Sequence, residues 1–317
     1  MATGNTPKTL QQAVIYFSNP DNCREYLVAR RWPDGVECPI CGRNDASYLA
    51  NQKKWQCKSA HKGRQFSAKT GTIFEDSPLG LDKWLTAVWL ITNAKNGISS
   101  YEVHRAIGVT QKTAWFMLQR IRLAMQSGSF LKKMNGHVEV DETFIGGLAR
   151  NMHATKRKHL GTGGAGKVAV MGLLERHGEV RAHVIPNTQT ETLHSHVSRH
   201  VEQGANVYSD SYTGYRNLEQ EFIHGVINHA ERYVDGQVHT NGIENFWSLL
   251  KRSIKGTYVS VEPFHLFRYL DEQTFRFNGR RGTDGERFQK VMEQLSGKRL
   301  TYAEVTGKDK DARKLSC

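Results

Sequence analysis

The spacing of apolar positions divides the chain into a mainly helical first part and a second part richer in strands. Residues 1–35 are predicted to be helical and to end where Pro33 and Asp34-Gly35 interrupt the pattern. Residues 36–75 form a compact, turn-rich stretch with cysteines. Residues 76–128 are predicted to be helical, because large apolar residues recur there at the spacing of one helix face: Trp84, Val88 and Ile91.

Residues 137–295 carry Val- and Ile-rich stretches bounded by glycine, interspersed with stretches of helical spacing. We predict strands at 137–144, 168–174, 180–185, 206–209 and 222–227, and helices at 190–200, 212–218 and 242–255. Three strands, helix, strand, helix, strand, helix is the order of an RNase H-like α/β domain with a mixed sheet. The remaining tail, 296–317, is predicted to be basic and disordered. The fold class expected is thus a multidomain α+β protein.

The charge balance indicates a polyanionic partner. Lys and Arg total 44 against 31 acidic residues, for a net charge of +13, and cationic side chains bind DNA by releasing counterions from its phosphates. A merely basic soluble protein is the alternative. The sequence contains no run of about 18 apolar residues, so no membrane span is predicted. The N-terminus lacks the layout of a signal peptide. The five cysteines do not resemble a secreted disulfide framework, so a cytoplasmic, nucleoid-associated protein is expected.

Four residues have the spacing of a structural zinc site. Cys38 and Cys41 are two residues apart and are followed by a glycine, which suits one half of a tetrahedral site. Cys57 supplies a third ligand, but Ala60 occupies the expected fourth position, so His61 is the predicted replacement. One structural Zn2+ in a Cys3His ribbon is expected. The alternative is a degenerate ribbon that has lost its metal and is held by packing.

Residues 98–122 have the pattern of a helix-turn-helix, with a short helix, a turn centred on Gly108 and a second helix from about Thr110. In such a motif the start of the second helix faces the bases of DNA. The predicted DNA contacts are therefore Gln111, Lys112 and Thr113. Two ordinary packed helices are the alternative.

Acidic residues interrupt the apolar strand 137–144. Asp141 lies in this strand, where a buried carboxylate is costly unless it is paired or bound to metal. Glu139 and Glu142 flank it and compete for the same role. Asp210 follows the apolar run Asn206–Tyr208, and Glu244 opens the helix predicted at 242–255.

Both later carboxylates also have purely structural explanations. Asp210 has the position of an N-cap for the helix predicted from residue 212, and Asn241 with Glu244 resembles a capping box. In the predicted strand order, however, Asp141, Asp210 and Glu244 converge at one edge of the sheet. Two Mg2+ (or Mn2+) ions about 4 Å apart would relieve their repulsion and activate an oxygen nucleophile for attack on phosphorus.

Basic residues near these carboxylates are predicted to contact DNA phosphates. Lys251 lies two helical turns after Glu244 on nearly the same face. A basic segment contains Lys156, Arg157 and Lys158. The glycine-rich segment 161–167 that follows has the spacing of a P-loop, but Val168 replaces the Ser or Thr that holds Mg2+ there. A loop that contacts DNA is therefore expected rather than an ATPase site.

These motifs together resemble DDE transposases of bacterial insertion sequences, of the ISXO type that joins an N-terminal zinc ribbon to an RNase H-like domain. The resemblance covers about residues 10–280. Its motifs are RWPDG at 31–35 before CPICG at 38–42, FS at 66–67 with TGTIF at 70–74, VDET at 140–143 with GG at 146–147, SD at 209–210, and HTN at 239–241 before ENFWS at 244–248 and KR at 251–252.

The resemblance implies that Asp141, Asp210 and Glu244 bind the catalytic metals and that Lys251 is the trailing basic residue of the catalytic site. Arg252 is expected to contact DNA. As an alternative, Asn245 or His239 shares with Glu244 the role of third metal ligand. The implied activity is binding to double-stranded transposon ends, hydrolysis to free 3′-OH groups, and attack of those groups on target DNA. Because two ends must meet, a homodimer or larger assembly is expected. Two other hypotheses are a DNA-binding regulator without activity and a nuclease that does not join.

Overall fold

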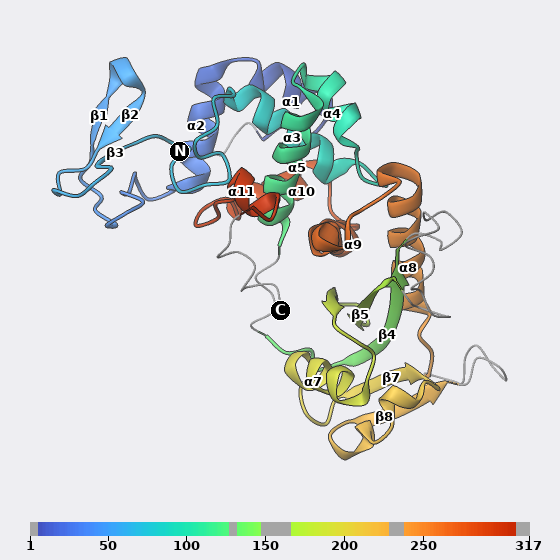
Figure 1. Ribbon diagram of the computed structural model, residues 1–317. Helices are drawn as coiled ribbons and strands as arrows, with labels where there is room; N and C mark the ends of the chain where they lie inside the picture. The colour runs from blue at the N-terminus through green and yellow to red at the C-terminus, as the bar shows by residue number, and fades with distance from the viewer. Residues whose placement is uncertain (1–5, 127–131, 147–165, 228–237, 309–317) are drawn as a thin grey trace. The chain divides into compact units, whose positions relative to one another are not determined.

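The computed structural model describes residues 6–126, 132–146, 166–227 and 238–308. It forms two compact units. One comprises residues 1–125 together with 281–317, and the other comprises residues 126–280. Figure 1 shows the elements of each. Lys156, Arg157, Lys158 and the glycine-rich segment up to residue 165 lie outside the described residues.

The first unit contains a small antiparallel sheet and helices that pack around α3. Its sheet consists of β1 (Ser47–Leu49), β2 (Lys54–Gln56) and β3 (Gln65–Phe66) in that order. Its helices are α1 (Leu10–Phe17), α2 (Pro20–Arg31), α3 (Leu81–Asn93), α4 (Ser100–Ile107), α5 (Gln111–Met125), α10 (Asp284–Glu293) and α11 (Tyr302–Val305). The helices predicted in residues 1–128 are therefore present, and α3 is buried because its apolar residues face its neighbours on several sides.

Local capping explains where several of these helices begin and end. The Asn19 side chain accepts hydrogen bonds at the start of α2, and Pro20 occupies the first helical position. Ser99 and Glu102 form a capping box at the start of α4. α4 ends at Gly108, whose φ of 62° is in the left-handed region that favours glycine. The predicted turn between two helices is thus observed, with α5 starting directly after it.

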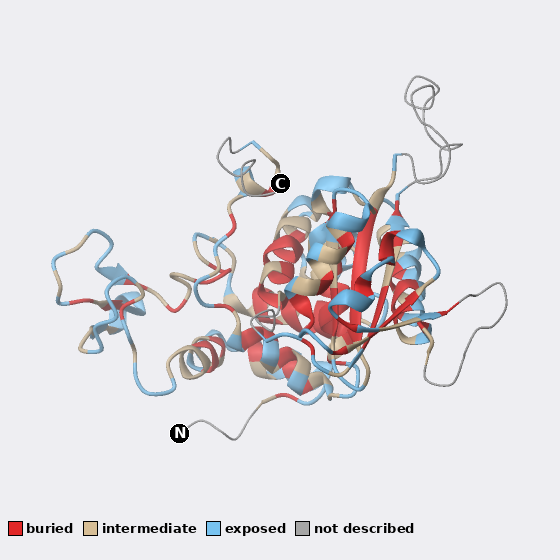
Figure 2. Cartoon of the chain, turned by 90° about the horizontal axis from the view of Figure 1, so that it is seen from below, coloured by how far each residue is buried: buried red, intermediate tan, exposed pale blue. Residues whose placement is uncertain are grey.

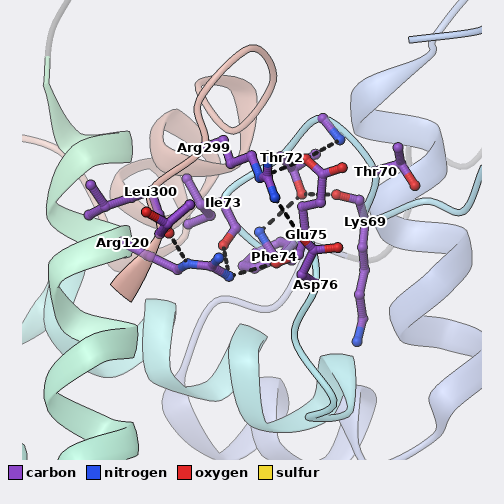
Figure 3. A network of polar contacts seen from close by, with 12 residues as sticks. Lys69, Thr70, Thr72, Ile73, Phe74, Glu75, Asp76, Arg120, Arg299 and Leu300 are labelled. Atoms are coloured by element: carbon purple, nitrogen blue, oxygen red, sulfur yellow. Dashed lines mark hydrogen bonds and ion pairs between the residues drawn. The ribbon is translucent and has the colours of Figure 1, made fainter. Parts of the chain in front are cut away.

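The C-terminal segment differs from the prediction, which ended the strand-rich region at 295 and left 296–317 disordered. α10 belongs to the first unit because Phe288, fully buried, packs on Trp89 with ring centroids 5.1 Å apart and on Phe17 at 5.6 Å. The buried Arg120 of α5 then holds the next segment, donating to the carbonyl oxygens of Leu300 at 2.8 Å, Ile73 at 3.0 Å and Glu75 at 2.8 Å (Figure 3).

The second unit is built on a five-stranded mixed sheet with the strand order β6-β5-β4-β7-β8. Its strands are β4 (His137–Ile145), β5 (Val168–Glu175), β6 (Val180–Ile185), β7 (Asn206–Asp210) and β8 (Ile223–Ile227). β4, β5 and β6 are antiparallel neighbours, whereas β7 is parallel to β4 and β8 is parallel to β7. The five strands agree with those predicted to within one or two residues.

Helices cover both faces of this sheet. On one face, Val138, Val140, Met171 and Leu173 form a core with α7 (Thr190–His200). On the other, Val170 and Leu174 pack with α8 (Asn241–Ser253) and α9 (Leu266–Asn278). Buried residues gather along the central strands and the inward faces of the helices (Figure 2). The strands β4 and β5 therefore contribute alternate residues to two cores.

The prediction of a single helix at 212–218 is wrong. Two short 3-10 helices occupy the region instead, η4 (Thr213–Tyr215) and η5 (Leu218–Gln220). Asn217 separates them with a φ of 68°, a left-handed conformation that an α-helix does not contain.

Candidate functional site

The predicted zinc ligands come together in the first unit. One ligand atom from each of Cys38, Cys41, Cys57 and His61 lies within 4.8 Å of all the others. The Cys38 sulfur is 3.5 Å from His61 Nε2, and the sulfurs of Cys41 and Cys57 are also 3.5 Å apart. Four donors around a tetrahedral zinc ion are separated by roughly 3.5–3.8 Å. The arrangement therefore fits one structural zinc ion in a Cys3His site.

Local electrostatics favours the thiolate form of Cys41, whereas burial raises the pKa of the Cys38 thiol. The pKa of the Cys41 thiol is lowered to about 6, mainly because the backbone N–H of Arg43 donates to its sulfur. The thiolate is the form that binds metal. Gly42, with a φ of 74°, supplies the turn after the first pair of cysteines.

In the second unit, β4 presents Asp141 to the face of the sheet that α8 covers. Asp141 pairs with Gly172 of β5. Its Oδ2 accepts a hydrogen bond of 2.9 Å from the indole N–H of Trp247 on α8, and its Oδ1 accepts one of 2.9 Å from the backbone N–H of Glu142. Trp247 approaches this closely because Gly172 has no Cβ, which would lie 2.5 Å from the indole ring. Two donors thus orient the Asp141 carboxylate.

Asp210 ends β7 on the same face. β7 pairs in parallel with β4, with Tyr208 opposite Glu139, so two residues further along each strand bring Asp210 beside Asp141. Adjacent strands are about 4.8 Å apart. The pKa of Asp141 is raised to about 7, first by burial and then by the negative charges of Glu142 and Asp210. The strand order therefore brings these two predicted ligands together.

Asp210 also has a local structural role, but it is not a helix N-cap as the alternative predicted, since the N-cap of η4 is Tyr212. Asp210 Oδ1 accepts a hydrogen bond of 3.0 Å from the backbone N–H of Tyr212. The segment that it stabilises is a turn leading to η4 rather than an α-helix.

The two glutamates that flank Asp141 have different environments. Glu142 points to the opposite face, where it accepts a hydrogen bond of 2.6 Å from the hydroxyl of the buried Tyr215. Glu139 shares the face of Asp141 but is 1% exposed and is surrounded by donors. Its Oε1 lies 2.9 Å from Arg176 Nε and 3.2 Å from His239 Nδ1, and its Oε2 accepts from the backbone N–H of Ile243 at 3.0 Å.

Glu244 lies in the first turn of α8 and is exposed. Its carboxylate accepts a hydrogen bond of 2.9 Å from the Thr240 hydroxyl. Thr240, not Asn241, is the N-cap of α8, so the predicted Asn241–Glu244 capping box does not form. Among the described residues, only the Cys3His group brings three or more possible metal-ligand atoms together. Asp141, Asp210 and Glu244 do not form such a group in this structure.

The basic residues predicted beside these carboxylates lie at the end of α8. Lys251 and Arg252 are in its last turn, and both are exposed. Asn245, an alternative third ligand, is also exposed on α8.

The residues predicted to contact DNA at the start of α5 all make contacts within the first unit. The Gln111 amide donates to the Ser100 hydroxyl of α4 at 2.8 Å, and Thr113 bonds to Thr110 at 2.8 Å. The Lys112 ammonium lies 4.8 Å from the centre of the Tyr302 ring of α11. Lys112, Thr113 and Tyr302 line a pocket of about 310 Å³.

Sequence reasoning missed the polar groups that connect β4 to α8, namely Arg176 and the indole N–H of Trp247. It also missed Tyr215 as the partner of Glu142. A signal was present for one distinction: residues two apart in a strand share a face, so Glu139 belongs with Asp141 and Glu142 does not. The partners of each carboxylate depend on distant segments of the chain.

Two family models match the chain, and both describe transposases. Residues 133–278 match the ISXO2-like transposase domain, and residues 18–62 match the transposase zinc-ribbon domain. The chain is also 29% identical, over 252 residues, to a protein described as "Uncharacterized protein in transposable element ISH50" from Halobacterium salinarum. That similarity spans 74% of this chain and 83% of the relative.

These findings confirm the resemblance to insertion-sequence transposases. Residues 133–278 are similar to the ISXO2-like transposase domain, and residues 18–62 are similar to the transposase zinc-ribbon domain. The transposase domain indicates a function in DNA transposition. Across the parts of the chain that the structure describes, every helix is too short or too polar to cross a lipid bilayer.

Proposed function

We propose that this protein binds the ends of an insertion sequence, hydrolyses them to free 3′-OH groups and joins those groups to target DNA. The observation that carries the proposal is that Asp141 and Asp210 lie on neighbouring parallel strands, two residues beyond the paired Glu139 and Tyr208, and that burial and the charges of Glu142 and Asp210 raise the pKa of Asp141 to about 7. Carboxylates that destabilise each other in this way are stabilised by a divalent cation.

Asp141 and Asp210 would hold Mg2+ or Mn2+, and Glu244 would complete the set from α8. When bound, a pair of such ions activates the attacking oxygen and stabilises the leaving oxygen in phosphodiester cleavage. The oxygen donors present are those that Mg2+ prefers. Trp247 and the backbone of Glu142 orient Asp141 by donating to its two oxygens. Lys251, Arg252 and the basic segment 156–158 would contact DNA phosphates.

We also assign the second unit to the RNase H-like class. Three consecutive antiparallel strands, followed by two strands parallel to the first, agree with the arrangement expected from the element order. In the first unit, the zinc ribbon and the pair α4–α5 would bind the transposon ends, with Gln111, Lys112 and Thr113 at the DNA. Bringing two ends together requires a homodimer or a larger assembly.

The test is cleavage and strand transfer with labelled element ends in Mg2+, comparing the wild-type protein with Asp141→Asn and Asp210→Asn. We expect at least a hundredfold loss of cleavage, because metal coordination contributes several kcal/mol to the transition state. End binding, measured by gel shift without Mg2+, should remain near the wild-type level. Glu202→Gln is a matched control, since Glu202 is exposed on the same unit.

Full cleavage by either aspartate variant would remove that residue from the mechanism. Glu244→Ala and Asn245→Ala, tested in parallel, determine which of them supplies the third ligand. Cleavage without joining by the wild-type protein would favour the simple nuclease.

A further inference from the structure

A buried polar network lies beside the proposed metal ligands and connects β4, β7 and the residue that follows β5 to the start of α8. At its centre is Glu139, whose two carboxylate oxygens face Arg176, His239 and the backbone N–H of Ile243. Arg176 also donates to the carbonyl oxygen of His239 at 2.9 Å, and its guanidinium lies 4.5 Å from the centre of the Tyr208 ring of β7. Arg176 thus links Glu139 of β4 to the backbone of the segment before α8.

Glu139 contacts the backbone at the start of α8 directly. Ile243 lies in the first turn of α8, so its N–H is one of the helix donors without an intrahelical partner, and a carboxylate is favoured at this positive end of the helix. Gly242 makes the approach possible, since a Cβ there would lie 2.8 Å from Glu139 Oε2. A residue with a side chain at 242 would force the helix start away from β4.

Glu139 and Asp141 bind successive turns of the same helix. Glu139 holds the turn that contains Ile243, and Asp141 accepts from Trp247, one turn further on. Glu244 lies between these two points of attachment. Because Glu139 is 1% exposed and both of its oxygens have donors, it is not available to a metal ion.

We propose that Glu139 is a positioning residue: with Arg176 it fixes the first turn of α8, and hence Glu244, relative to Asp141 without binding metal itself. This inference rests on the proposed function. Groups that orient metal ligands typically change metal affinity or activity by about 10–100-fold when they are replaced.

The test uses the full-length, zinc-loaded protein with Glu139→Gln, Arg176→Gln and the double variant. Mn2+ affinity is measured from the signal of free Mn2+ in electron paramagnetic resonance, thermal unfolding by circular dichroism, and cleavage over a Mg2+ titration. We expect each single variant to bind Mn2+ about tenfold more weakly and to need correspondingly more Mg2+ for half-maximal cleavage.

The double variant separates positioning from stability. Each single change leaves a buried charge without its partner, whereas the double change removes both charges, so it should regain most of the lost Tm. Its Mn2+ affinity should stay weak, because the bridge from Glu139 through Arg176 to His239 is absent. If Mn2+ affinity returned with the Tm, Glu139 would have only a structural role and the proposal would be overturned.

Two further outcomes would also overturn it. If Arg176→Gln bound Mn2+ as well as the wild type while Glu139→Gln bound none, Glu139 would itself be a ligand. If Asp141→Asn lost Mn2+ binding and cleavage but Glu139→Gln kept wild-type values, only the positioning role would fail. Wild-type binding and cleavage by Asp141→Asn would instead contradict the proposed function.

Discussion

Replacing Gly172 with alanine tests the contact through which α8 reaches Asp141. A Cβ at this position would lie 2.5 Å from Cζ2 of Trp247 and 2.7 Å from Cδ1 of Ile243. Carbon atoms in contact are normally about 3.5–4.0 Å apart, so the overlap with the indole is about 1 Å. Trp247 is 4% exposed and packs in the core shared by α8 and α9. The ring therefore cannot move aside without displacing the helix.

The expected loss of stability follows from two opposing effects. Overpacking of this kind costs about 1–3 kcal/mol, and the lower entropy of alanine in the unfolded chain offsets about 0.4–1 kcal/mol. We expect a net loss of about 1–2 kcal/mol, which corresponds to a Tm lower by about 3–6 °C for a unit of this size. Cleavage should also fall, because displacing Trp247 removes a donor that orients Asp141.

Thermal unfolding by circular dichroism and cleavage of labelled ends are the measurements. Gly256→Ala is the control, because no atom lies within 4 Å of a Cβ built there. Gly172→Ala combined with Trp247→Phe should regain part of the Tm without regaining cleavage, since phenylalanine has no N–H to donate. Wild-type Tm and cleavage in Gly172→Ala would refute the reasoning.

Three other perturbations have defined outcomes. Elemental analysis should find one zinc ion per chain in the wild-type protein and none in Cys57→Ser. Residues 36–75 of this variant should be cleaved faster by protease. Equal zinc content in the two proteins would contradict the proposed zinc site. Arg120→Met removes the donor to three carbonyl oxygens and should lower the free energy of unfolding by about 3 kcal/mol, measured as a lower Tm. An unchanged Tm would show that these hydrogen bonds do not stabilise the unit. His183 stacks on His200 with ring centroids 4.6 Å apart. Burial and nearby positive charges lower the pKa of His183 to about 3. In the unfolded chain His183 is protonated below about pH 6.5, whereas in the folded protein it stays neutral down to much lower pH. Acid therefore favours the unfolded chain, and the free energy of unfolding should fall by up to about 2 kcal/mol from pH 7.5 to pH 5. His183→Gln should make the free energy of unfolding less dependent on pH in this range. An unchanged pH dependence would contradict the assignment to His183.

Local patterns were sufficient to predict most elements of both units. Apolar spacing and Gly108 locate α3, α4 and α5 within a few positions, and Val- and Ile-rich runs bounded by glycine locate the strands of the sheet. The zinc ligands were predictable because the cluster is built from neighbouring turns, so that spacing alone determines which side chains meet. The proximity of Asp141 to Asp210 followed from the strand order, since residues at corresponding positions of adjacent parallel strands lie side by side.

The roles of the individual carboxylates depended on tertiary structure. Glu139, Asp141 and Glu142 are nearly adjacent in the chain, yet one is enclosed by Arg176 and α8, one is oriented by Trp247, and one bonds to Tyr215. Which donor meets which acid depends on strand register and on the face that α8 covers. The same holds for α10, because a buried face such as that of Phe288 shows only that a partner exists. That partner lies some two hundred residues away, and only packing identifies it.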